Sequence, residues 1–130
     1  MTAAIPDSHR DLLAAPGVGV LSTIGPDGRP QSTAIWFLLD GEVIRTSLHR
    51  SRQKYRNMLA TPRATLFVFD PASAYRTIEV RSDVTVADDG DLSFLTRLLS
   101  HYGRDLATFA APVDDRAVVT FTPARVVTNG

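Results

Sequence analysis

The alternation of hydrophobic and polar positions along the chain predicts a protein built mainly from β-strands. Predicted strands cover 17–24, which alternates, 31–39 and 42–46, and two short turns, at 25–30 and 40–41, separate them. Three strands joined by such short turns form an antiparallel meander, because parallel neighbours need crossovers of a dozen or more residues.

Three further segments have strand character. A buried apolar run covers 64–69, a long alternating segment covers 75–87, and a final strand covers 117–127, where Pro123 bends the strand or marks a sheet edge. A meander that must hide its edges tends to close into a barrel. The predicted fold is therefore mainly β with short helices, arranged as a six-stranded antiparallel barrel.

Short helices are predicted between the strands. The first covers 7–15, the second 51–60 and the third 92–102, and a shorter helical turn covers 105–110. In the first helix the predicted caps are Asp7 or Ser8, and the predicted inward residues are Leu12 and Leu13.

The second helix has a well-defined start, face and end. Ser51 is its predicted N-cap, and its predicted inward face holds Tyr55, Met58 and Leu59 at i, i+3 and i+4 spacing. The Thr61-Pro62 dipeptide then ends the helix, because proline disfavours helical geometry in the preceding residue.

Two local patterns yield further predictions. Trp36 and Phe37 are neighbours on a strand, so they face opposite ways, and Trp36 is expected to be the more exposed. The acidic stretch at 88–91 is interpreted as the cap of the third helix and not as a set of metal ligands. The three histidines have no metal-ligand spacing.

Composition narrows the class of protein. The 44% hydrophobic and 22% charged content of the 130 residues is typical of a soluble globular chain, predicted to be one domain over 1–130. No apolar run reaches the ~20 residues that span a bilayer, and no secretory signal is visible. The chain has no cysteine, which excludes disulfides and thiolate chemistry. These features favour a cytoplasmic protein.

Formal charge balances to zero, but one segment is strongly basic. The segment 46–59 contains the only lysine of the chain, and no acidic residue occurs between Glu42 and Asp70. Overall balance argues against a general nucleic-acid binder, whose surface is usually basic. The role of this segment must be local, and its basic residues are Arg50, Arg52, Lys54 and Arg56.

The predicted elements place this charge at the start of a helix. A strand end bearing Thr46 and Ser47 is followed by a loop that carries the cations to the second helix, with Arg56 one turn beyond Arg52. Exposed N–H groups and the helix dipole make such an end an anion site. The pattern thus favours a phosphate-bearing ligand, and a solvated helix face remains the alternative interpretation.

Three stretches together resemble a known superfamily. They are GVGVLSTIGPDGRPQSTAIWFLLDG, TSLHRSRQKYRNMLATPRATLFVFD and YRTIEVRSDVTV. They resemble the pyridoxamine 5′-phosphate oxidase-like flavin-binding split barrels, and within these the small actinobacterial oxidoreductases that depend on the deazaflavin coenzyme F420. The most specific matches are the Ser-Arg-x-Lys-x-x-Asn run at 51–57, which ends at Asn57, and Thr-Pro-Arg-Ala at 61–64.

This resemblance implies a homodimer of six-stranded split barrels, with a cofactor in each of two clefts between protomers. It implies that Arg52 and Lys54 hold the cofactor phosphate, with Thr46 and Ser47 nearby. One departure is Ser82, where many relatives have glycine. The residues implied to line the ring are Gln31, Ser32, Thr33 and Trp36, and those implied to approach from the other subunit are Tyr75 and Arg76.

The implied activity is hydride transfer from reduced F420 to a conjugated small molecule, with the proton supplied by solvent or by a hydroxyl such as that of Tyr75. Extra arginines favour F420 over FMN, because they could meet the polyglutamate tail, and the candidates are Arg50, Arg56 and Arg76. The alternatives are an FMN-dependent oxidoreductase and a non-catalytic cofactor-binding protein. A nucleic-acid or membrane partner is not expected.

Overall fold

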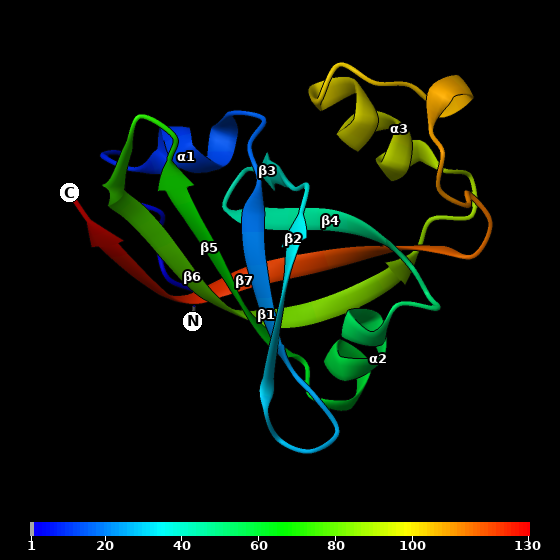
Figure 1. The fold of residues 1–130 in the computed structure, drawn as a ribbon, viewed down its shortest axis with the longest axis horizontal. Coiled ribbons are helices and arrows are strands. Elements are labelled where there is room, and N and C mark those ends of the chain that lie inside the picture. Colours follow the sequence, from blue (N-terminus) through cyan, green and yellow to red (C-terminus); the bar gives the residue numbers. More distant parts are fainter. Residues whose placement is uncertain (1) are drawn as a thin grey trace.

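The computed structural model describes residues 2–130 and confirms a mainly β architecture with short helices (Figure 1). All strand pairs are antiparallel, and one seven-stranded sheet has the order β2-β1-β5-β6-β7-β4-β3. The strands are β1 (Gly19–Ile24), β2 (Pro30–Ile35), β3 (Leu38–Asp40), β4 (Val43–His49), β5 (Arg63–Asp70), β6 (Ser73–Asp88) and β7 (Arg116–Asn129).

The prediction of six strands is wrong because the segment 31–39 forms two strands. β2 pairs with β1 and β3 pairs with β4, at opposite edges of the sheet. Between them, the Phe37 N–H donates to the Tyr102 hydroxyl at 3.0 Å instead of to a strand. The two sheet edges are thus joined through residues 36–37 but do not pair within residues 2–130, so the predicted closed barrel is an open, curled sheet.

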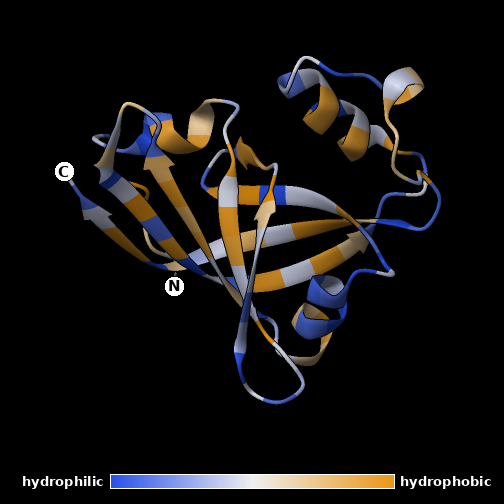
Figure 2. Cartoon of the chain, in the orientation of Figure 1, coloured by the Kyte–Doolittle hydropathy of each residue, from blue (hydrophilic) through white to orange (hydrophobic). Residues whose placement is uncertain are grey.

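The curled sheet surrounds the main hydrophobic core. Buried and more exposed positions alternate along β1 and through the middle of β6, as predicted, whereas β2 is exposed over all but its last residue (Figure 2). Phe37 is fully buried, whereas its neighbour Trp36 is only partly buried, which confirms that Trp36 is the more exposed, although both lie between β2 and β3 and not on a strand as predicted. The largest fully buried side chains include Phe37, Phe121, Leu13, Leu21, Ile44, Met58, Leu66, Ile78, Leu95 and Leu99.

At Pro123, β7 pairs with β6 alone, because its pairing with β4 ends at Phe121. The prediction that Pro123 bends the strand or marks an edge is therefore confirmed at this position. Proline has no N–H for the ladder, and the register with β6 shifts between Arg81 and Ser82, where Ser82 is the partner of Pro123. The hydroxyl of Ser82 is buried at this irregularity without a hydrogen-bond partner among the described residues.

The helices follow the predicted order but begin later than expected. They are α1 (Arg10–Ala14), α2 (Gln53–Ala60), α3 (Ser93–His101) and the 3-10 turn η1 (Leu106–Thr108). The predicted cap of α1 is wrong, because His9 holds that position and makes no side-chain cap bond. The inward positions of Leu12 and Leu13 are confirmed.

Two details of α2 also differ from the prediction. Ser51 is not its cap: the Ser51 hydroxyl bonds the His49 ring at 2.7 Å, and Arg52 holds the cap position without a side-chain cap bond. Tyr55 and Met58 are buried as predicted, but Leu59 is 57% exposed. The N-terminal N–H groups of α2 therefore have no side-chain cap, as an anion site requires.

The acidic turn before α3 acts as a cap, as predicted. The buried carboxylate of Asp89 accepts from the backbone N–H of Phe94 at 3.1 Å and of Leu95 at 3.0 Å. Asp91 accepts from the Ser93 N–H at 3.1 Å. This cap fixes α3 against β4, where it closes one side of the cavity described below. No helix within residues 2–130 is long and apolar enough to cross a bilayer.

Candidate functional site

A cavity of about 320 Å³ lies between the end of β2, the end of β4, the start of α2 and one face of α3. Leucines of α3 form its apolar wall, and no carboxylate among the described residues lines it. Its polar wall holds two hydroxyls and three cations, which we call the phosphate corner: Thr46, Ser47, Arg52, Lys54 and Arg116.

Strand β4 supplies the two hydroxyls. The Thr46 hydroxyl donates to the Trp36 carbonyl at 2.7 Å, which fixes the bend between β2 and β3 beside the cavity. Ser47 is only 9% exposed, and its hydroxyl has no hydrogen-bond partner among residues 2–130. A buried hydroxyl without a partner is costly. Its position on the cavity wall leaves this hydroxyl open to a group bound in the cavity.

Lys54 reaches the cavity from the first turn of α2. Its ammonium donates to the Thr33 hydroxyl at 3.0 Å. The lysine predicted to hold the phosphate thus contacts the strand predicted to line the ring. Burial lowers the pKa of Lys54, and the nearby charge of Arg52 lowers it further. Arg52 itself makes no ion pair within the described chain. An anion in the cavity would relieve this repulsion.

Arg116 is a cavity residue that the sequence analysis missed. Its Nε donates to the Pro112 carbonyl at 2.9 Å, and its guanidinium lies 5.2 Å from the centre of the Phe109 ring. Burial lowers the pKa of Arg116, and the charge of Arg52 lowers it further. Because Asp114 and Asp115 precede it, the local sequence suggests a surface arginine whose charge is neutralised by these carboxylates. Arg116 reaches the cavity because β7 pairs with β4, which places Arg116 opposite His49.

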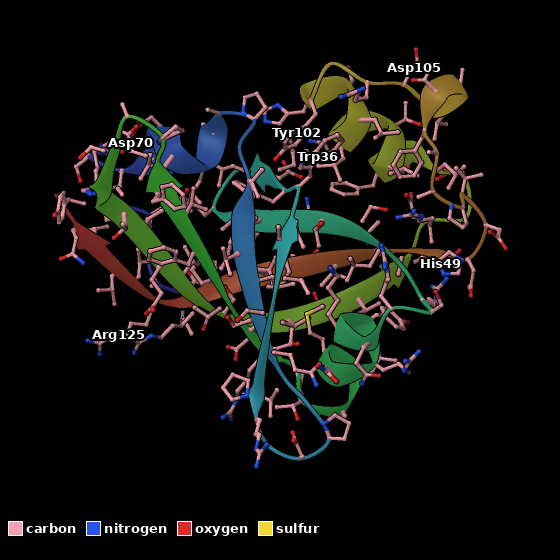
Figure 3. All side chains as sticks on the ribbon, viewed as in Figure 1. Trp36, His49, Asp70, Tyr102, Asp105 and Arg125 are labelled. Carbon is pink, nitrogen blue, oxygen red and sulfur yellow. The ribbon has the colours of Figure 1, made fainter. Side chains whose placement is uncertain are left out.

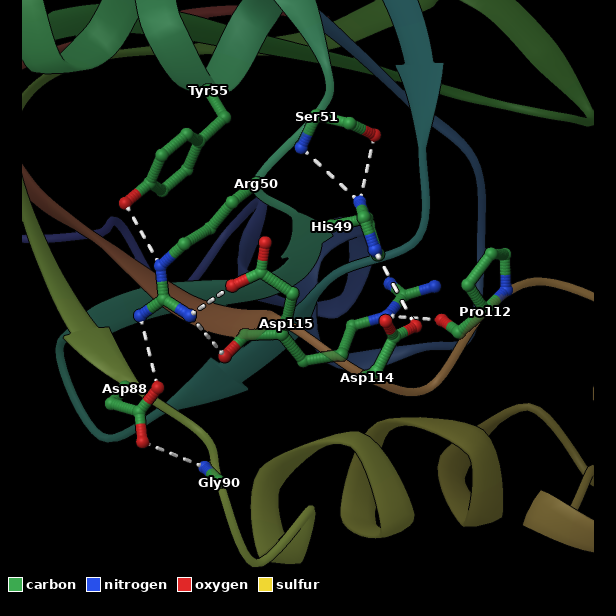
Figure 4. Close-up of polar contacts among 10 residues, drawn as sticks. His49, Arg50, Ser51, Tyr55, Asp88, Gly90, Pro112, Asp114 and Asp115 are labelled. Atoms are coloured by element: carbon green, nitrogen blue, oxygen red, sulfur yellow. Dashed lines mark hydrogen bonds and ion pairs between the residues drawn. The ribbon is translucent and has the colours of Figure 1, made fainter.

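Arg50 is engaged elsewhere, because carboxylates from outside the acid-free stretch between Glu42 and Asp70 neutralise it (Figure 4). Its guanidinium pairs with Asp88 at 3.0 Å and with Asp115 at 3.2 Å. It also donates to the Tyr55 hydroxyl at 3.2 Å and to the Arg116 carbonyl at 3.2 Å. Both carboxylates are distant in sequence, and β6 and β7 bring them together.

The other predicted arginines also have protein partners. Arg56 donates to the Ser51 carbonyl at 2.7 Å and to the Gln53 side chain at 2.8 Å. Arg76 pairs with Asp11 at 2.5 Å and with Asp70 at 3.3 Å. Neither arginine lines the cavity.

Tyr75 lies at the start of β6 and is 89% exposed, and it does not line the cavity either. Its prediction as a contact from the other subunit stays a prediction.

Two predicted residues, Asn57 and Gln31, fasten α2 to the β1–β2 hairpin, and a third, Ser32, joins the two strands of the hairpin. Asn57 is buried, and its amide donates to the Thr23 hydroxyl at 3.1 Å and to the Gln31 side chain at 2.9 Å. The hydroxyls of Ser32 and Ser22 lie 2.8 Å apart across the hairpin. These contacts position the helix start that carries Arg52 and Lys54.

The phosphate corner suits a phosphate group on chemical grounds. Guanidinium and ammonium groups, a free hydroxyl and uncapped N–H groups at the start of a helix are the donors that phosphates bind. The adjoining Trp36 and the leucines of α3 provide an apolar wall. The donor set thus fits the phosphate and flat ring of a flavin-type cofactor, which supplies redox chemistry that side chains lack.

Comparison with known proteins agrees with this fit. The sequence profile described as pyridoxamine 5′-phosphate oxidase matches residues 5–130. A solved structure of an F420 reductase is 37% identical in sequence, with a TM-score of 0.86. That match covers 95% of this chain and 98% of the reductase.

More distant structures share the fold alone. A conserved hypothetical protein of Mycobacterium tuberculosis is 20% identical over 98% of this chain and 86% of that chain, with a TM-score of 0.76. General Stress Protein 26 of Bacillus anthracis is 17% identical over 95% of this chain and 92% of that chain, with a TM-score of 0.73.

Proposed function

Because the chain belongs to the pyridoxamine 5′-phosphate oxidase family, we propose that it is an F420-dependent oxidoreductase that reduces a conjugated small molecule. The family and the likeness to an F420 reductase support an oxidoreductase-type role with a flavin or deazaflavin. When bound, the reduced deazaflavin supplies a hydride to an electron-poor carbon of the acceptor, and a proton completes the two-electron reduction.

The unpartnered polar groups of the phosphate corner carry this proposal. Arg52 makes no ion pair in the described chain, and the Ser47 hydroxyl is buried without a partner. Arg52 supplies a bidentate fork and Lys54 a compact charge, and together they hold the cofactor phosphate. Arg116 adds a third charge that the phosphate neutralises.

Strand β2 and α3 orient the ring and exclude water in this proposal. Thr33 holds the Lys54 ammonium, Trp36 lines the cavity beside the ring position, and Leu95 and Leu98 supply an apolar wall. Gln31 lies on the same face of β2 as Thr33, whereas Ser32 faces the opposite way; both stay candidates for contacts to the ring. The proton for the acceptor comes from solvent or from the exposed hydroxyl of Tyr75.

FMN is the second candidate cofactor, because the same corner would hold its phosphate. The 37% identity to an F420 reductase favours the deazaflavin. Arg50, Arg56 and Arg76 stay candidates for its acidic tail, but each would have to exchange a protein partner for a carboxylate of the tail.

A homodimer is part of the proposal. Phe67 and Phe69 are exposed on β5, and Val18 is exposed just before the start of β1. Three large apolar side chains on neighbouring positions favour burial against a second protomer. Such an arrangement would let Tyr75 approach the partner's cavity. Sedimentation of the purified protein tests it: a dimer is expected, and a Phe67→Lys variant should sediment as a monomer.

Parallel fluorescence titrations with F420 and FMN test the cofactor assignment. We expect saturable binding with a preference for F420, and oxidation of bound reduced F420 on addition of a quinone or another conjugated acceptor. Tighter binding of FMN would favour the FMN-dependent alternative. Binding of F420 without turnover by any acceptor would favour a cofactor carrier, and binding of neither would refute the proposal.

A further inference from the structure

A second cavity of about 330 Å³ adjoins the first. Trp36, Phe109 and Ala111 line both cavities, so the two are adjacent and share these walls. We call the second cavity the aromatic groove; its lining residues are Trp36, Arg104, Thr108, Phe109, Ala110 and Ala111.

One wall of the aromatic groove is a fixed aromatic platform. The Trp36 ring stacks on Tyr102 with 4.4 Å between ring centres and 7° between planes (Figure 3). The Tyr102 hydroxyl donates to the Gly17 carbonyl at 2.6 Å, accepts from the Phe37 N–H at 3.0 Å, and also lies 3.1 Å from the Phe37 carbonyl. Trp36 is thereby held in place before any ligand arrives.

Phe109 contributes a second aromatic surface. The Arg116 guanidinium lies over its ring and ties this residue to the phosphate corner. A groove with indole and phenyl walls favours flat, conjugated molecules, because aromatic rings stack in offset or edge-to-face contacts.

The aromatic groove also has a cation in its lining. Arg104 is exposed and makes no ion pair within residues 2–130. Its neighbour Asp105 forms no ion pair with it; the Oδ1 atom of that carboxylate accepts from the Thr108 N–H at 3.0 Å and from the Thr108 hydroxyl at 2.9 Å. None of the described residues that line the groove carries a carboxylate. A free guanidinium in this position matches a carboxylate.

We propose that the aromatic groove binds the acceptor, a planar conjugated molecule with a carboxylate that Arg104 holds. This inference rests on the proposed function, because it gives the substrate class of the same site. The acidic tail of F420 is another source of carboxylates, but a flexible tail would make no use of the aromatic walls.

Quenching of tryptophan fluorescence tests the inference directly, because Trp36 is the only tryptophan of the chain. The probes are anthraquinone-2-carboxylate and its uncharged amide, with inorganic phosphate in excess to fill the phosphate corner and no cofactor present. We expect the wild type to bind the acid about tenfold more tightly than the amide. The Arg104→Ala variant should lose this preference, and Arg104→Lys should keep part of it.

Arg52→Ala is the matched control, since it removes an arginine of the phosphate corner and should leave the preference intact. Equal binding of acid and amide by the wild type would overturn the inference, as would an unchanged preference in Arg104→Ala. A preference lost in Arg52→Ala instead would place the acid at the phosphate corner, which also contradicts it.

A second pair of titrations identifies the source of the carboxylate. If Arg104→Ala weakens binding of F420 but not of FMN, the groove holds the cofactor tail and the acceptor assignment is wrong. Equal affinities of wild type and Arg104→Ala for F420 support the acceptor assignment. Failure of both cofactors to bind would refute the proposed function alone, because the quenching assay contains no cofactor.

Discussion

Arg50 and Arg52 are two residues apart, yet they occupy opposite electrostatic surroundings. Arg50 is held by Asp88, Asp115 and the Tyr55 hydroxyl, so its charge is used within the fold. Arg52 has no carboxylate partner within residues 2–130 and lies on the wall of a cavity with Lys54 and Arg116. The difference shows that a basic segment can combine structural cations with cations left free for a ligand.

The largest expected effect follows from removing the free cations. Replacing Arg52 or Lys54 by alanine should weaken F420 binding by about 1.5–3 kcal/mol each, the contribution of a charge-assisted hydrogen bond. The two losses need not add, because the residues are neighbours. Fluorescence titration measures the affinities, and the melting temperature of the apoprotein should barely change.

Arg125→Ala is the control for these variants, since this exposed arginine lies on β7 away from the cavity (Figure 3). Its affinity for F420 should equal that of the wild type. If both Arg52→Ala and Lys54→Ala also kept the wild-type affinity, the assignment of the phosphate corner would be wrong.

Arg116→Met should give a smaller loss of cofactor affinity, about 1–2 kcal/mol, because one of three cations is removed while the apolar volume is largely kept. Since burial and the nearby Arg52 disfavour this charge, which lowers the pKa of Arg116, the apoprotein should not lose stability. Thermal unfolding with and without F420 separates the two effects. A large fall in apoprotein stability would show that Arg116 is a structural cation like Arg50.

The pH dependence of F420 affinity should reveal the titration of Lys54. Its pKa is lowered in the folded protein, chiefly by burial, and only its charged form attracts phosphate. Affinity for F420 should therefore fall as the pH rises through this lowered pKa, before an ordinary lysine would titrate. The Lys54→Arg variant keeps its charge at these pH values and should give a flat profile. Equal slopes for both proteins would exclude Lys54 as the titrating group.

Arg50→Ala should change F420 affinity least, by less than about twofold or ~0.4 kcal/mol. Because Asp88 and Asp115 would lose their shared partner, the melting temperature should fall. A variant with normal stability and weakened F420 binding would reverse the roles assigned to Arg50 and Arg52.

Periodicity predicted most of the fold because local patterns determine strands and caps. The strands beyond residue 60 and the Asp89 cap of α3 follow from alternation and from carboxylate chemistry near a helix start. The break between β2 and β3 did not follow, because it depends on a hydrogen bond from Phe37 to Tyr102, which is 65 residues away along the chain. Nothing in the local pattern of 31–39 contains that information.

The candidate site could be predicted only in part, for the same physical reason. The basic segment indicated Arg52 and Lys54, and the structure places both on one cavity wall. Whether an arginine is free depends on carboxylates brought by other strands, so Arg50 could not be separated from Arg52. The sequence did not indicate Arg116, because the two aspartates before it suggest an arginine whose charge is neutralised locally. In the structure, Asp115 pairs with Arg50 instead.

The phosphate dependence of binding tests the central claim most directly. Affinities for F420 and for the deazaflavin riboside that lacks phosphate and tail would be measured in the wild type, in the Arg52→Ala/Lys54→Ala double variant and in Arg50→Ala. We predict that the wild type and Arg50→Ala prefer F420 over the riboside by about a hundredfold or more, and that the double variant loses most of this preference. An equal preference in all three proteins, or a loss confined to Arg50→Ala, would contradict the account.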